Sequence, residues 1–88
     1  MKIKENFTLR QISDTWVILP LAEATVNFNG MITLNESGVL LWNLLLDGCT
    51  REELADALQR EYEVSFDEAL SDVDEFVGKL NDAGCIDF

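Results

Sequence analysis

The stretch that decides the fold spans residues 30–42 and reads Gly-Met-Ile-Thr-Leu-Asn-Glu-Ser-Gly-Val-Leu-Leu-Trp. Residues 31–34 form a short apolar run typical of a β-strand, whereas the apolar residues after Asn35 follow the period of a helix. Asn35 is a favourable N-cap, because its side chain can accept a hydrogen bond from the first helical turn. The chain is therefore predicted to change from strands to helices here.

Before this stretch the sequence favours short strands. Residues 7–12 and 16–19 are rich in apolar side chains, and Pro20 stops the second run. Residues 13–15, Ser-Asp-Thr, have the composition of a tight turn between the two runs. A first hairpin is predicted from this pattern.

A second hairpin is predicted at Asn29-Gly30, which lies between two further apolar runs. The first third of the chain is thus expected to form an antiparallel meander of three or four strands. Residues 1–6 precede the first apolar run and are expected to be flexible.

After the meander the sequence predicts three helices. The first is expected from about Glu36 to Leu46 and is apolar around most of its circumference. Residues 50–53, Thr-Arg-Glu-Glu, form a capping box for a second helix that reaches about Tyr62. The third and longest begins after Ser65 and ends before Gly84. Strands followed by three helices predict one α+β domain over residues 1–88.

The third helix carries an apolar arc wide enough that one margin of it is available to line a groove. The two margins are Leu70 with Val77, beside Asp74 and Asn81, and Phe76 with Ala83, beside Asp72 and Lys79. The sequence leaves open which margin does so, and also whether the whole arc packs in the core.

Charge restricts the partners. Seventeen acidic residues against six basic ones give a formal net charge of −11, which repels nucleic acid and anionic membrane surfaces. A basic or amphipathic peptide is a better partner, although acidity can also serve solubility alone. The chain has no apolar run approaching a membrane span and no signal segment, and its two cysteines lack metal-ligand spacing, so a cytoplasmic protein with reduced thiols is expected.

Composition also argues against catalysis. The chain contains no histidine, which excludes Ser-His and Cys-His nucleophilic chemistry. Its five glycines are scattered and form no phosphate-binding loop, and no stretch has the pattern of a calcium-binding loop. The acidic residues of the third helix are interpreted as a solvated face. We therefore expect no enzyme activity, no cofactor and no metal.

The order and spacing of these motifs resemble the PqqD-like family, named after the pyrroloquinoline quinone biosynthesis protein D. The resemblance covers roughly residues 7–88 and rests on residues 30–38, Leu41-Trp42, residues 47–54, residues 58–62 and the pattern from Asp67 to Gly84. It implies a winged-helix-like fold that recognises the leader segments of ribosomally synthesised precursor peptides. The meander diverges from that of the founding member, so pyrroloquinoline quinone synthesis itself is not implied.

The resemblance also implies a site. In the family the leader adds as a strand beside the third strand and packs against the third helix. Carried over by position, the peptide-binding residues are Met31, Ile32, Thr33, Leu70, Val73, Val77 and Leu80, with Asp74 and Asn81 as a polar rim. Val77→Asp is then expected to abolish peptide binding without unfolding the domain. Family members present the peptide to a modifying enzyme, often a radical S-adenosylmethionine (radical SAM) protein.

Other functions fit the residues less well. A DNA-binding winged helix needs a basic recognition helix, but the third helix carries six acidic residues against Lys79. An acyl-carrier protein needs an Asp-Ser-Leu motif, whereas Ser37 and Ser65 stand in other contexts. A small scaffold or a homodimer formed through the same strand edge, without a peptide substrate, remains the alternative.

Overall fold

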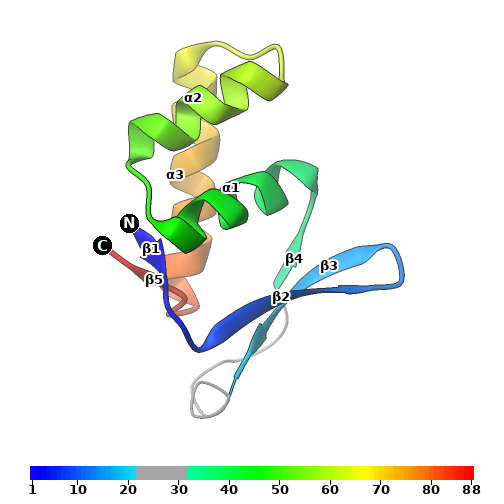
Figure 1. Ribbon diagram of the computed structural model, residues 1–88. Helices are drawn as coiled ribbons and strands as arrows, with labels where there is room; N and C mark the ends of the chain where they lie inside the picture. The colour runs from blue at the N-terminus through cyan, green and yellow to red at the C-terminus, as the bar shows by residue number, and fades with distance from the viewer. Residues whose placement is uncertain (22–31) are drawn as a thin grey trace.

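The computed structural model describes residues 1–21 and 32–88. The hairpin expected at Asn29-Gly30 and the predicted site residue Met31 lie outside the described residues. The elements are β1 (Lys2–Ile3), β2 (Phe7–Ile12), β3 (Thr15–Pro20), β4 (Ile32–Leu34), α1 (Glu36–Asp47), α2 (Arg51–Glu61), α3 (Phe66–Asp82) and β5 (Ile86–Asp87). Antiparallel strands followed by three helices confirm the predicted α+β class (Figure 1).

A three-stranded antiparallel sheet has the order β2-β3-β4. The first hairpin is confirmed, because Ile12 pairs with Thr15 across a two-residue loop in which Ser13 has a φ of 55°. On the other side of β3, Val17 faces Thr33 and Ile18 faces Ile32. The side chains of β4 alternate, with Thr33 exposed between two half-buried neighbours.

The three helices begin where the sequence predicts, because each N-cap side chain accepts a hydrogen bond from the third residue of its helix. Thr50 forms the complete capping box with Glu53. Gly84, at a φ of 76°, follows the end of α3 and allows the Cys85 N–H to donate to the Leu80 carbonyl at 2.9 Å. None of the described helices is long and apolar enough to cross a bilayer.

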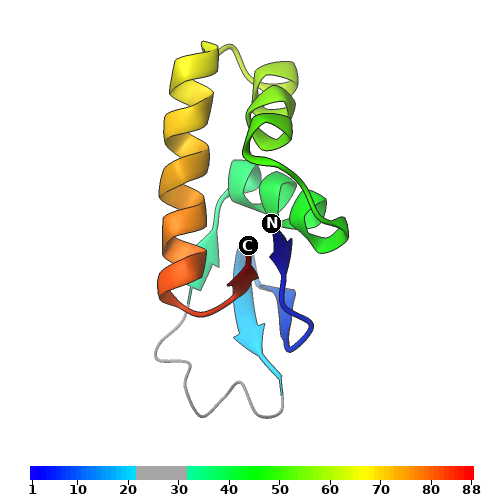
Figure 2. The same cartoon turned by 90° about the vertical axis from the view of Figure 1, so that its left-hand side faces the viewer.

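The two ends of the chain form a second, smaller sheet. β1 and β5 are antiparallel, with Lys2 opposite Asp87 and Ile3 opposite Ile86. Figure 2 shows them side by side below α1. The sequence pattern predicts no element in residues 1–6, whereas Ile3 is paired and buried there. Its partner Ile86 lies at the far end of the chain, and local sequence patterns do not reveal so distant a pairing.

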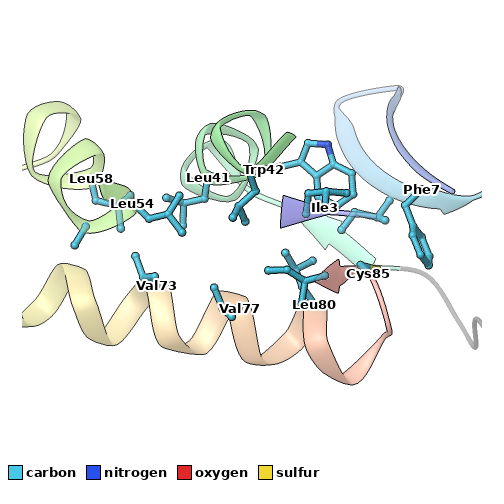
Figure 3. Packing of buried hydrophobic residues seen from close by; sticks show 14 of the residues in the cluster. Ile3, Phe7, Leu41, Trp42, Leu54, Leu58, Val73, Val77, Leu80 and Cys85 are labelled. Atoms are coloured by element: carbon cyan, nitrogen blue, oxygen red, sulfur yellow. The ribbon is translucent and has the colours of Figure 1, made fainter. Parts of the chain in front are cut away.

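The hydrophobic core lies between α3 on one side and α1, α2 and the strands on the other. Its buried residues include Ile3, Ile18, Leu41, Trp42, Leu45, Leu54, Leu58, Val73, Val77 and Leu80. Figure 3 shows Val73, Val77 and Leu80 pointing from α3 toward the side chains of α1 and α2. Each fully buried aliphatic side chain contributes about 1.5–3 kcal/mol to stability. These contacts determine which side of α3 faces inward.

Candidate functional site

β4 lies at an edge of the sheet. Among the residues that the structure describes, its pairing partner is β3 alone, through Trp16–Leu34, Val17–Thr33 and Ile18–Ile32. The backbone N–H and C=O groups that point away from β3 form a template for one more strand. The expected edge near residues 31–34 is therefore present over the described range of β4.

A groove accompanies this edge. Figure 2 shows β4 beside the C-terminal half of α3, and a hollow of about 270 Å³ lies between them. Its lining residues are Ile32, Thr33, Leu34 and Asn35 from the strand and its end, Gly38 from α1, and Phe76, Lys79 and Leu80 from α3. We call this hollow the β4–α3 groove. An extended segment placed in it would have a strand on one side and a mostly apolar helix margin on the other.

The margin of α3 that lines the groove carries Phe76 and Lys79. The opposite margin faces α2, where Arg51 donates to the carboxylate of Asp74 through Nε at 2.6 Å and Nη2 at 2.7 Å. These hydrogen bonds lower the pKa of the Asp74 carboxyl below its ordinary value. The Asp74 margin therefore belongs to the α2–α3 contact, whereas the Phe76 margin lines the β4–α3 groove.

Of the predicted site residues that the structure describes, three lie together and five lie apart from them. Ile32, Thr33 and Leu80 line the β4–α3 groove, with Leu80 fully buried at its base. The remaining predicted residues lie outside this lining: Val73 and Val77 are buried in the core, Leu70 is half-buried against it, Asp74 is paired with Arg51, and Asn81 is exposed.

Five residues line the groove but were not among the predicted site residues: Leu34, Asn35, Gly38, Phe76 and Lys79. Phe76 and Lys79 were visible in the sequence as the second margin of the apolar arc. A helical wheel treats the two margins as equivalent, so no signal within the helix distinguishes them. The positions of α2 and β4 on different sides of α3 provide the distinction.

One end of the groove is formed where β4 meets α1. The Oδ1 atom of Asn35 accepts hydrogen bonds from the Gly38 N–H and the Ser37 hydroxyl, each at 2.9 Å. Gly38 is buried, and a Cβ atom there would lie 3.2 Å from the Cβ atom of Leu34. The glycine therefore allows the first turn of α1 to approach β4 closely.

The groove combines apolar side chains with one charged group among its described lining residues. Lys79, whose Nζ is 4.0 Å from the Glu75 carboxylate, is highly exposed and supplies a positive charge beside an apolar surface. The described residues contain no cluster of His, Cys, Asp and Glu side chains suited to hold a metal ion. Cys49 and Cys85 lie outside the groove lining, and burial raises the thiol pKa of each, that of Cys85 to about 11.

Comparison with known proteins gives one family and two similar structures. Residues 15–86 match the family of Coenzyme PQQ synthesis protein D (PqqD). The fold is similar to TbiB1 in complex with the TbiA(beta) leader peptide, with a TM-score of 0.76 and 28% identity, covering 97% of this chain and 93% of that one. It is also similar to lasso peptide synthetase B1 complexed with the leader peptide, with a TM-score of 0.75 and 25% identity, covering 96% and 93%. No curated protein sequence matches the chain.

Proposed function

Because the chain belongs to the PqqD family, we propose that it is a non-catalytic protein that binds the leader segment of a ribosomally synthesised precursor peptide. The observation that carries the proposal is the edge of β4 lying beside the apolar margin of α3. The two similar structures support it, since each contains a chain of this fold together with a leader peptide.

The leader adds to β4 as a further antiparallel strand. Main-chain hydrogen bonds to residues 32–34 supply affinity that depends little on sequence, and side-chain contacts with α3 supply selectivity. Phe76 offers a half-buried ring, and Leu80 closes the base of the groove. An apolar leader side chain that points toward α3 would replace water against the exposed part of the Phe76 ring.

The other predicted residues of α3 lie outside the groove lining and position the helix. Val73 and Val77 hold α3 against the helices that face it, and the Arg51–Asp74 pair ties α3 to α2. Leu70 and Asn81 lie on that same margin of the helix. We propose that these five α3 residues influence peptide binding through the position of α3. Ile32, Thr33, Phe76 and Lys79 contact the leader, and the buried Leu80 supports the base of the groove.

Charge favours a leader with basic residues. The net charge of −11 attracts cationic segments over about a Debye length, ~8 Å at physiological ionic strength, and repels nucleic acid. Among the described residues that line the groove Lys79 is the one cation, so an acidic leader residue is accommodated beside it. Peptide binding is therefore expected to weaken as salt is added.

The chemistry of modification belongs to a separate enzyme to which this chain presents the peptide. The family resemblance implies a radical SAM protein for that role. Both cysteines are free, and a cytoplasmic location would keep them reduced.

Isothermal titration with synthetic leaders of the small peptides encoded beside the gene tests the proposal. Phe76→Asp should abolish the binding heat, because it places a carboxylate in the groove. Phe66→Asp is the matched control, since it makes the same change on the same helix at a 40%-exposed phenylalanine outside the groove. Equal loss of binding in both variants, or no binding of any leader by the wild type, would contradict the proposal.

The same edge can pair with a second copy of the chain. Sedimentation of the free protein distinguishes this homodimer from a monomer. If the edge of β4 forms a homodimer, leader binding should shift the sedimentation coefficient toward that of a monomer, because both partners compete for the same backbone groups.

A further inference from the structure

The β4–α3 groove continues beyond the end of β4. A second hollow of about 240 Å³ shares Asn35, Gly38, Phe76 and Lys79 with it. A third hollow of about 480 Å³ shares Asn35, Ser37, Leu58 and Asp72 with the second. Because consecutive hollows share lining residues, they lie next to one another along α3, from the Leu80 end toward the Asp72 end, and we call the three together the trough.

The third hollow, which we call the distal pocket, has an apolar wall at the end of α2. Leu58, Tyr62 and Val64 form this wall, and Glu36 and Asp72 stand among the other lining residues. Tyr62 is 37% exposed, so part of a large aromatic surface is open to solvent here. The described residues that line this pocket include no basic side chain.

We propose that the distal pocket holds an apolar side chain of the same leader, from a residue outside the segment paired with β4. The inference rests on the proposed function and names a second recognition element for that peptide. Continuity of the trough identifies the occupant, because a chain leaving β4 past Asn35 enters the second hollow and then this pocket. The acidic lining favours Lys or Arg beside the apolar residue.

The spacing follows from the geometry of α3. From Leu80 to Asp72 the helix rises over eight residues, which corresponds to about 12 Å. An extended peptide spans about 3.3 Å per residue, so roughly four residues bridge this distance. The leader residue whose side chain occupies the distal pocket, which we call the anchoring residue, is thus about four positions away from the leader residue opposite Ile32.

The direction also follows from the sheet. β2, β3 and β4 pair only in antiparallel fashion, and an added strand that continues this pattern would run opposite to β4. Since β4 runs toward Asn35 and the distal pocket, an antiparallel leader reaches the pocket before it reaches β4. The anchoring residue is therefore N-terminal to the paired segment.

A double-mutant cycle tests the contact, with the tightest-binding synthetic leader and its alanine-scanned copies as probes. Alanine at one apolar position about four residues before the paired segment should weaken wild-type binding about tenfold or more, as expected for a buried apolar side chain. Tyr62→Ala should weaken the unmodified leader by a similar factor. The Tyr62→Ala protein should bind the alanine-substituted leader as tightly as the wild-type protein binds that leader.

Phe66→Ala is the matched control, because Phe66 is an aromatic residue of similar exposure outside the pocket lining. It should reproduce the wild-type alanine scan. In the wild-type protein, the methyl NMR signals of Val64 should also shift when the leader is added. Because this second measurement uses the wild-type protein, its result does not depend on whether a variant folds.

The outcomes separate the two proposals. If Tyr62→Ala shows the same alanine scan as the wild type and the Val64 signals do not move, the distal contact is refuted while strand addition at β4 stands. If no leader binds the wild-type protein, both proposals fail together.

Discussion

Replacing Val77 by aspartate should unfold the domain, whereas the same change at the adjacent Phe76 should mainly remove peptide binding. Val77 is 9% exposed and points from α3 toward the side chains of α1 and α2 (Figure 3). Phe76 is half-buried and lines the β4–α3 groove. Two neighbouring residues on one helix thus belong to different environments. The position carried over from the family resemblance placed Val77 in the groove and predicted that Val77→Asp leaves the domain folded.

The magnitudes follow from burial. Removing the two methyl groups of Val77 from the core costs about 1.6 kcal/mol, at about 0.8 kcal/mol for each buried carbon. A carboxylate left without a partner in the core adds several kcal/mol more. A domain of 88 residues has a free energy of unfolding of about 4–13 kcal/mol, so Val77→Asp removes much or all of it. Phe76→Asp should cost about 1–2 kcal/mol, because its carboxylate reaches water.

Stability is measured by urea denaturation, followed by far-ultraviolet circular dichroism and by the fluorescence of Trp16 and the buried Trp42. Binding is measured by calorimetric titration with a leader. Val77→Asp should have little native signal at zero urea. A Val77→Asp protein with the wild-type urea midpoint and no peptide binding would refute the assignment of Val77 to the core. A Phe76→Asp protein that binds the leader normally would refute the position of the groove.

Three further outcomes are expected. Asp74→Asn should lower the urea midpoint slightly at pH 7, because it removes the ion pair with the exposed Arg51. Since Arg51 lowers the pKa of the Asp74 carboxyl, the difference in midpoint between variant and wild type should be lost as the pH falls below about 3.8, the ordinary pKa of this carboxyl. Burial raises the thiol pKa of Cys85 from 9.0 to about 11, so the wild type should lose stability relative to Cys85→Ala as the pH rises through that range. Alkylation monitored by mass spectrometry should modify the half-buried Cys49 before the buried Cys85. Gly38→Ala should weaken leader binding severalfold in the titration, because the added methyl group presses on Leu34 and Asn35 and shifts the end of β4. The urea midpoint should change little, because the higher helix propensity of alanine offsets part of the cost of this contact.

Local sequence was sufficient for the elements and their order. Asn35, Thr50 and Ser65 each accept a hydrogen bond from a backbone N–H three residues ahead, so helix starts depend on neighbours within one turn. Gly84 ends α3 for an equally local reason, its φ of 76°. These features were therefore predictable, as was the edge character of residues 32–34.

Composition and motif order by themselves also limit the function. A net charge of −11 argues against nucleic acid as a partner, and the chain contains no histidine, the base of the common nucleophilic triads. The motif order indicates the family, which the match over residues 15–86 confirms. Both inferences need only the identity of the residues and their order.

Tertiary structure decided the features that depend on contacts between distant segments. β1 is a strand because β5, at the other end of the chain, pairs with it. The rotation of α3 about its axis is set by the side chains of α1 and α2, with Arg51 holding Asp74 on one side and β4 lying near Phe76 on the other. A helical wheel contains the two margins of α3 but not its neighbours, and for this reason the groove-lining margin could be identified only in the folded chain.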